Sequence, residues 1–229
     1  MAVFNLNQRM VKPMVFGSTA AYLILAALYT IPLTQNNALY LPVGFLCLIS
    51  LWLTPWEISL ALFFSAFGDF AGSCNCLLTQ IGAFTVAQVL YTIFFLRRYH
   101  RKVENDRKLT EKAKGYLAMT LFCVISLLTL ILVKIVPAAP AGIIQTGVGT
   151  YGFVICIMMF AALLQRSMLY AFGALLFVIS DFLLAWNLFI ESVPYASALI
   201  LGTYFAAQWL LFVRATPYRV SHPVHLLRF

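Results

Sequence analysis

The sequence predicts an all-α membrane protein built as an eight-helix transmembrane bundle. The chain has 229 residues, of which 63% are hydrophobic and only 10% charged, whereas soluble domains carry about 25% charged residues. The apolar residues fall into separate runs, several of which reach the length of about 20 residues that an α-helix needs to cross a bilayer. We therefore expect residues 1–229 to form a single integral membrane domain.

The first two helices are expected at about residues 14–33 and 39–53. The first run is longer than the hydrophobic part of a signal peptide and lacks a convincing small-residue cleavage site, so we interpret it as a retained helix. A polar turn at 34–37 separates the two helices, and Pro55 ends the second.

The third helix begins near Trp56 and the fourth covers about residues 78–96. The third helix carries Asp69 within its apolar run, before Gly72 and Asn75 loosen the helix. An ionisable residue inside a membrane span is costly and usually faces the bundle interior or a water-filled cavity. Asp69 is therefore a candidate site residue.

A basic loop over residues 97–114 follows and contains eight of the fifteen Lys and Arg residues. This concentration is typical of a topology signal and linker. Contact with anionic lipid headgroups is a second role for such a segment. No nucleic-acid partner is expected, because the positive charge follows the membrane topology.

The second half contains four more helices, at about residues 116–136, 143–164, 168–189 and 195–213. It resembles the first half in one respect: each half has an Asp followed six residues later by an Asn, and then an Ala-Gln pair in the next helix. This suggests repeat-like units, about 14–97 and 116–213, in a parallel arrangement because each holds an even number of helices.

Eight helices place both termini and the basic loop on the same side of the membrane. All the positive residues except Lys134 then fall on that side, which the positive-inside rule identifies as cytoplasmic. The chain carries no retrieval or lipidation signal, which leaves the plasma or inner membrane as the default location.

Asp69 and Asp181 are the expected catalytic pair. At about 1.5 Å per residue both lie just past the middle of a hydrocarbon core about 30 Å thick, at similar depth in helices that run in the same direction. Two carboxyls that share a low-dielectric site hold one proton between them, which suits general acid and general base chemistry. The candidate substrate-binding residues are Asn75, Gln88, Tyr91, Tyr151, Asn187, Tyr204 and Gln208.

No metal site is expected. Cys74 and Cys76 are spaced more tightly than the usual zinc-binding pairs, and all three histidines lie in polar segments. The acid–base chemistry of a carboxyl pair requires neither a metal nor an organic cofactor.

The segments around the two aspartates resemble the signatures of the YhhN-like family, which includes the lysoplasmalogenases. The similarity is specific over about 173–211, which includes Ser180-Asp-Phe-Leu-Leu-Ala-Trp-Asn187, and moderate over 62–91, which includes Phe64-Ser-Ala-Phe-Gly-Asp69. Tyr151-Gly152 is similar to the family's sixth-helix segment. Gln88 stands where members of the family commonly have His.

The resemblance implies a hydrolase that cleaves the vinyl ether bond of a lysoplasmalogen, giving a fatty aldehyde and a glycerophospho-base. Its partners would be this lysophospholipid, water and the lipid bilayer, with no cofactor. One Asp would supply a proton, and the other would stabilise the resulting oxocarbenium ion and activate water. The resemblance does not assign which Asp takes which role. The sequence leaves the head group, the chain length and the oligomeric state open.

Two other functions remain open from the sequence. A lipid-binding protein or proton-coupled transporter would use the same Asp pair without hydrolysis. Intramembrane Asp and Asn residues can also simply hydrogen-bond neighbouring helices together. Release of aldehyde by purified protein separates the enzyme from both alternatives.

Overall fold

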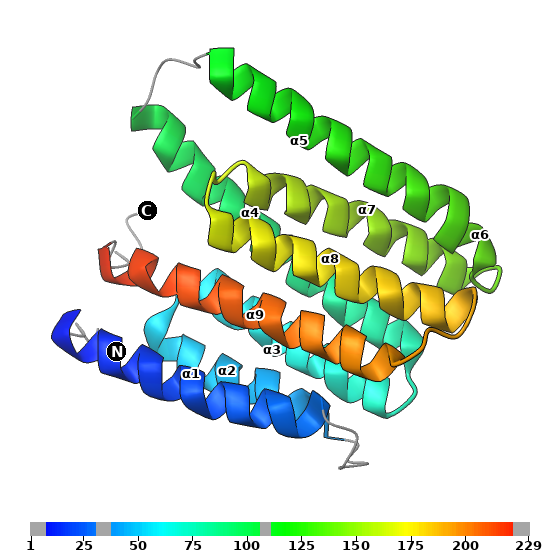
Figure 1. Ribbon diagram of the computed structural model, residues 1–229, viewed down its shortest axis with the longest axis horizontal. Coiled ribbons are helices and arrows are strands. Elements are labelled where there is room, and N and C mark those ends of the chain that lie inside the picture. Colours follow the sequence, from blue (N-terminus) through cyan, green and yellow to red (C-terminus); the bar gives the residue numbers. More distant parts are fainter. Residues whose placement is uncertain (1–7, 31–37, 106–110, 222–229) are drawn as a thin grey trace, which may run out of the picture.

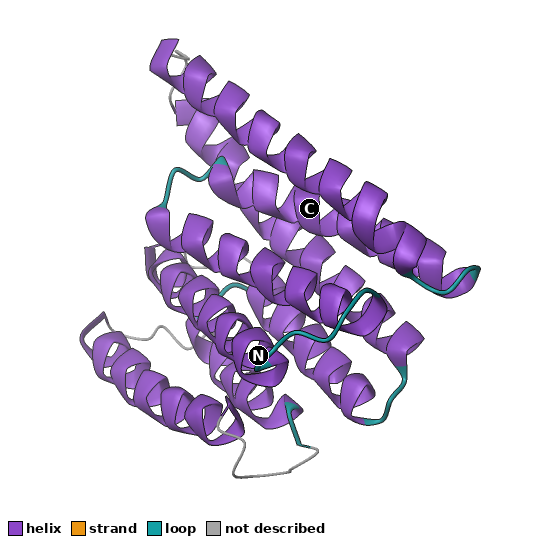
Figure 2. Ribbon diagram, turned by 45° about the vertical axis from the view of Figure 1, so that its right-hand side comes forward, coloured by secondary structure: helices purple, strands orange, loops and turns teal. Residues whose placement is uncertain are grey.

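A computed structural model of the protein describes residues 8–30, 38–105 and 111–221, and every regular element in these ranges is helical (Figures 1 and 2). The elements are α1 (Gln8–Thr30), α2 (Tyr40–Leu53), α3 (Trp56–Ser73), α4 (Leu77–Asn105), α5 (Glu111–Leu130), the π-helix η1 (Ile131–Ile135), α6 (Val136–Ala138), α7 (Ile143–Leu163), α8 (Met168–Phe189) and α9 (Ala196–Ser221). Because η1 and α6 continue α5, the described elements match the eight predicted helices.

Four helices extend beyond their predicted bounds. α1 begins at Gln8, and α9 continues to Ser221. α4 runs into the predicted basic loop to Asn105, and the continuous α5–α6 helix begins within that loop at Glu111. Arg, Lys, Glu and Gln are good helix formers, so a change from apolar to charged residues ends the membrane span without ending the helix. The predicted polar turn at 34–37 and the centre of the basic loop at 106–110 lie outside the described residues.

The chain is a multi-pass integral membrane protein. Six helical segments in the described ranges are long and apolar enough to cross a bilayer, and they belong to α1, α4, the continuous α5–α6 helix, α7, α8 and α9. The other two predicted helices differ: α2 has only 14 residues, and α3 has 18 residues that include Glu57 and Asp69. Both nevertheless pack within the bundle, on each other and, less extensively, on α9.

The helices pack in an order that brings both halves of the chain together. α3 packs on α4, α4 on α7, α7 on α8, and α8 on α9, which returns to α2 and α3 (Figure 1). α5 contacts α7 and lies at the edge of the bundle, while α1 lies against α2 and α9 at the opposite edge. This order places α3 and α8, the two helices that carry the aspartates, around a common interior.

Two glycines beside candidate site residues allow close helix packing. A Cβ at Gly68 would lie 2.9 Å from the ring of Phe84 on α4, and a Cβ at Gly152 would lie 2.7 Å from Cγ2 of Ile131 in η1. Real Cβ atoms do not approach other atoms this closely. Gly68 precedes Asp69 and Gly152 follows Tyr151, so these close approaches lie next to two candidate site residues.

Candidate active site

Asp69 on α3 and Asp181 on α8 line the same cavity. This larger cavity has a volume of about 390 Å³ and is bordered by α3, α4, α8 and α9. Both aspartates are partly buried. The fold therefore brings the predicted pair together from opposite halves of the sequence.

Asp69 is held by a tyrosine from another helix. The hydroxyl of Tyr204 on α9 donates to Oδ2 of Asp69 over 2.9 Å. The Tyr204 ring is itself fixed by edge-on contacts with Phe84 and Phe177, with ring centroids 5.9 and 5.5 Å away. This packing fixes the position of the donor relative to the carboxyl group.

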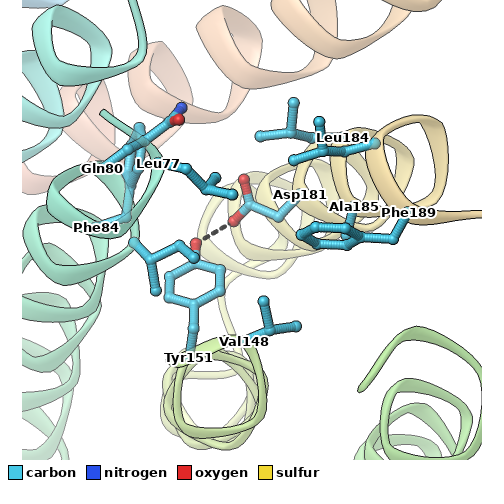
Figure 3. A pocket seen from close by; sticks show the side chains of 11 residues that line it. Leu77, Gln80, Phe84, Val148, Tyr151, Asp181, Leu184, Ala185 and Phe189 are labelled. Atoms are coloured by element: carbon cyan, nitrogen blue, oxygen red, sulfur yellow. Dashed lines mark hydrogen bonds between the residues drawn. The ribbon is translucent and has the colours of Figure 1, made fainter. Parts of the chain in front are cut away.

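Asp181 has an equivalent partner on a different helix. The hydroxyl of Tyr151 on α7 donates to Oδ2 of Asp181, while the other carboxyl oxygen points away from Tyr151 toward the space between Leu77 and Leu184 (Figure 3). Behind Tyr151, Nε2 of the fully buried Gln88 donates to the tyrosine oxygen over 3.4 Å. Gln88 thus reaches Asp181 only through Tyr151.

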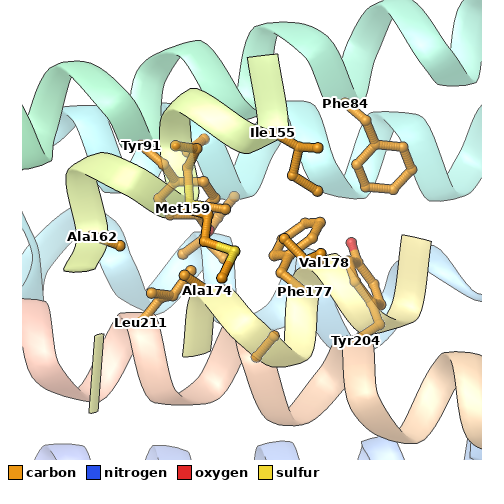
Figure 4. Close-up of a cluster of buried hydrophobic side chains, with 14 of the residues drawn as sticks. Phe84, Tyr91, Ile155, Met159, Ala162, Ala174, Phe177, Val178, Tyr204 and Leu211 are labelled. Atoms are coloured by element: carbon orange, nitrogen blue, oxygen red, sulfur yellow. The ribbon is translucent and has the colours of Figure 1, made fainter. Parts of the chain in front are cut away.

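Tyr91 and Gln208 form a second buried contact beside the aromatic core. The Tyr91 hydroxyl donates to Oε1 of Gln208 over 2.6 Å, and both residues are fully buried. Phe177 packs edge-on against both Tyr91 and Tyr204 (Figure 4). In the described structure, Oε1 of Gln88 and Nε2 of Gln208 have no hydrogen-bond partner. Buried polar groups are usually paired, so both amides retain capacity for a water molecule.

A smaller cavity lies on the other side of Asp181, between α4, α7 and α8. Its volume is about 70 Å³, and Ile81, Val148, Tyr151, Ala185 and Phe189 line this cavity and not the larger one. Leu77, Gln80, Phe84, Asp181, Leu184 and Leu188 line both. Asp181 therefore lies in the wall that the two cavities share, whereas Asp69 lines the larger cavity alone.

The two predicted asparagines lie in different environments. Asn75 is in the turn between α3 and α4 with φ 58°, is exposed, and lines the larger cavity. Asn187, near the end of α8, accepts a hydrogen bond from the backbone N–H of Val193 over 2.9 Å and lines neither cavity. The fold brings Asn75, but not Asn187, to the aspartates.

Gln80 is a cavity residue that the sequence analysis missed. It lines both cavities and lies against Gly72, where a Cβ would come within 2.8 Å of its Nε2. Gln80, Phe84, Gln88 and Tyr91 are spaced by four, four and three residues, which places them on one face of α4. This spacing, read from Gln88 toward the start of the helix, is the signal that identifies Gln80.

Two carboxyls that line one cavity are suited to general acid–base chemistry. Each carboxyl accepts a phenolic hydrogen bond and has access to a cavity with room for water. Within the described ranges, no group of three or more His, Cys, Asp or Glu side chains is arranged to hold a metal ion.

Comparison with known proteins adds sequence relationships to this geometry. The model of the YhhN family matches residues 40–215, which include both aspartates and both tyrosines that hold them. Lysoplasmalogenase TMEM86B of Homo sapiens is 41% identical over 61 residues, which are 27% of this chain and 26% of that protein. Lysoplasmalogenase TMEM86B of Rattus norvegicus is 40% identical over 62 residues, again 27% and 26% of the two chains.

The matched part spans about a quarter of the length of these curated relatives. No solved structure matches the chain significantly. The family model, in contrast, extends from α2 to α9 and includes all the elements that border the two cavities. The chain therefore belongs to the YhhN family.

Proposed function

We propose that this protein is an intramembrane ether hydrolase that cleaves the vinyl ether bond of lysoplasmalogens, with Asp69 and Asp181 as the catalytic residues. The observation that carries the proposal is that two carboxyls from distant helices line one cavity within an apolar bundle. The names of the two TMEM86B relatives give the substrate class. A substrate with a long hydrocarbon chain also suits a site among membrane-spanning helices.

The reaction begins with proton transfer to carbon. The protonated carboxyl gives its proton to the β-carbon of the vinyl ether, where the double-bond electrons form the new C–H bond. The resulting oxocarbenium ion is stabilised by the ionised carboxylate, as in the two-carboxylate logic of glycoside hydrolysis. Two carboxylates that line one cavity repel each other, which favours the state with one proton on the pair that this step needs.

Water then completes the hydrolysis. It adds to the carbon bonded to the ether oxygen while the carboxylate takes one of its protons, which gives a hemiacetal. The hemiacetal carbon–oxygen bond to glycerol breaks as the glycerol oxygen gains a proton and the hemiacetal hydroxyl loses one. The products are a fatty aldehyde and a glycerophospho-base, and the carboxyl pair again holds one proton.

The first test measures aldehyde release from a lysoplasmalogen by detergent-purified protein, comparing wild type with Asp69→Asn and Asp181→Asn. We expect each variant to lose activity by about 100-fold or more, since general acid–base groups contribute about 10²–10⁴-fold. The matched control is Glu191→Gln, because Glu191 is exposed, bonds to Trp186 and lines neither cavity.

Activity that persists in both folded Asp variants would remove the catalytic assignment. No aldehyde from folded wild type, tested with several head groups, would overturn the hydrolase proposal and favour a lipid-binding protein or transporter.

A further inference from the structure

The two cavities that meet at Asp181 differ in chemical character. The larger cavity carries the polar side chains of Asp69, Asn75, Gln80, Ser180 and Tyr204 in addition to Asp181. Apart from Gln80, Tyr151 and Asp181, the smaller cavity is lined by aliphatic side chains and the rings of Phe84 and Phe189. The larger cavity also has apolar walls, which include Leu39, Ile200 and Leu201. A cavity of mixed polar and apolar lining and a mainly apolar cavity thus adjoin at Asp181.

The larger cavity also reaches one end of the bundle. Asn75 lies in the turn between α3 and α4, and Leu39, Leu77 and Ile200 lie near the starts of α2, α4 and α9. A polar group can therefore reach this cavity from the end of the bundle, where the membrane meets water.

The smaller cavity lies close to the outer, apolar surface of α8. Leu188 lines both cavities and is itself 51% exposed, so it lies at the rim between the cavities and the surroundings of the bundle. A volume of about 70 Å³ is too small for a whole fatty chain. It has room only for the carbons nearest a bond held at Asp181, and the rest of the chain would continue past Leu188 into lipid.

From this arrangement, and resting on the proposed function, we infer how the substrate is placed. The glycerol part of the lysolipid occupies the larger cavity, with the phosphate toward the exposed end at Asn75, and the first carbons of its chain enter the smaller cavity. The bond to be cleaved then lies beside Asp181, where the cavities meet. Ala185 on α8 and Val148 on α7 determine which chain structures fit next to that bond.

The inference predicts a steric effect confined to the chain. Ala185→Leu fills the smaller cavity and is expected to lower kcat/KM for a straight-chain lysoplasmalogen by about tenfold or more, because single methylene changes in an apolar pocket alter specificity by about 10–200-fold. Val148→Ala widens the cavity and should raise the rate for a substrate with a methyl branch next to the vinyl ether relative to the straight-chain substrate. Ala118→Leu on α5 is the matched control, because Ala118 is exposed and lines neither cavity.

A second measurement does not depend on turnover. A non-hydrolysable alkyl-ether lysophosphatidylcholine with a diazirine near the ether end of its chain is photolysed with wild-type protein, and the labelled peptides are mapped. We expect labels on the walls of the smaller cavity around Ile81, Val148 and residues 184–189. Labels on Asn75, or spread over the exposed faces of α1 and α5, would overturn the inference.

The two experiments separate the inference from the proposed function. If Ala185→Leu leaves aldehyde release unchanged and the labels lie outside the smaller cavity, the substrate placement is overturned. The hydrolase proposal then stands. If the wild-type protein releases no aldehyde but the labels lie in the smaller cavity, the substrate placement is supported. The hydrolase proposal is then overturned.

Discussion

At the scale of single residues, the site is defined by hydrogen bonds between helices. Asp69 accepts from Tyr204 and Asp181 accepts from Tyr151, and each tyrosine belongs to a different helix from its aspartate. A helix that rotated or shifted would therefore move a carboxyl relative to its donor. In the proposed reaction the tyrosines are positioning residues, since each acts through the carboxyl that it holds.

Tyr151→Phe and Tyr204→Phe each remove one hydroxyl while keeping the ring. We expect each variant to lower kcat for aldehyde release by about tenfold to a hundredfold, because a hydrogen bond to a charged group is worth about 1.5–3 kcal/mol. KM should change little if the hydroxyls orient the carboxyls and do not bind lipid. A large rise in KM at unchanged kcat would contradict the positioning role.

At the scale of secondary-structure elements, the glycine before Asp69 lets α3 approach α4. Phe84 fills the space that a side chain at Gly68 would need, and it lines both cavities. The ring also contacts Tyr204 and Phe177 edge-on. Helix packing and the position of the Asp69 donor therefore depend on the same ring.

Gly68→Ala is expected to destabilise the protein by about 1–3 kcal/mol, the usual cost of overpacking a well-packed interior. Gly82→Ala on α4 is the control, because a Cβ at Gly82 would meet nothing within 4 Å. Thermal unfolding in detergent, followed by circular dichroism, should show a lower Tm for Gly68→Ala and no loss for Gly82→Ala. Equal Tm values would indicate that Phe84 moves aside freely.

At the scale of the whole molecule, the predicted topology places the α3–α4 turn on the side opposite the basic loop. Cys74 and Cys76 are free, exposed and adjacent to Asn75 at that turn. The cavity that reaches this end would then receive its substrate from the non-cytoplasmic side.

A membrane-impermeant maleimide should therefore label Cys74 and Cys76 in cells or vesicles whose cytoplasmic face is inside. The variant with Cys74→Ser and Cys76→Ser should lose that labelling. Labelling that appears only after permeabilisation would reverse the predicted orientation.

Hydropathy and charge predicted most of the fold, but not the contacts at the site. The predicted helix at 168–189 has the same bounds as α8, because its ends coincide with changes from apolar to polar sequence. α4 extends further, since helix propensity continues where hydrophobicity ends. α9 also extends further, to Ser221, although Pro217 lies in its last turns. Asn187 shows the limit of pattern matching: its position six residues after Asp181 parallels Asn75, yet it bonds to Val193 in the turn.

The partners of the aspartates depend on how the helices are rotated, which spacing along one chain does not determine. Tyr204 lies four residues before Gln208, but the corresponding position before Gln88 is Phe84, so Asp181 takes its donor from α7 and not from α4. The two halves are therefore not equivalent at the site. The division into repeat-like units at 14–97 and 116–213 stays a prediction.

The position of Asp181 between two unlike cavities has a consequence for how the reaction ends. In the proposed substrate placement, cleavage divides one amphiphile into a hydrophobic product beside Leu188 and a water-soluble product beside Asn75. The aldehyde can then diffuse sideways into the bilayer while the glycerophospho-base leaves for the aqueous phase. Departure into two immiscible phases separates the products and opposes their recombination.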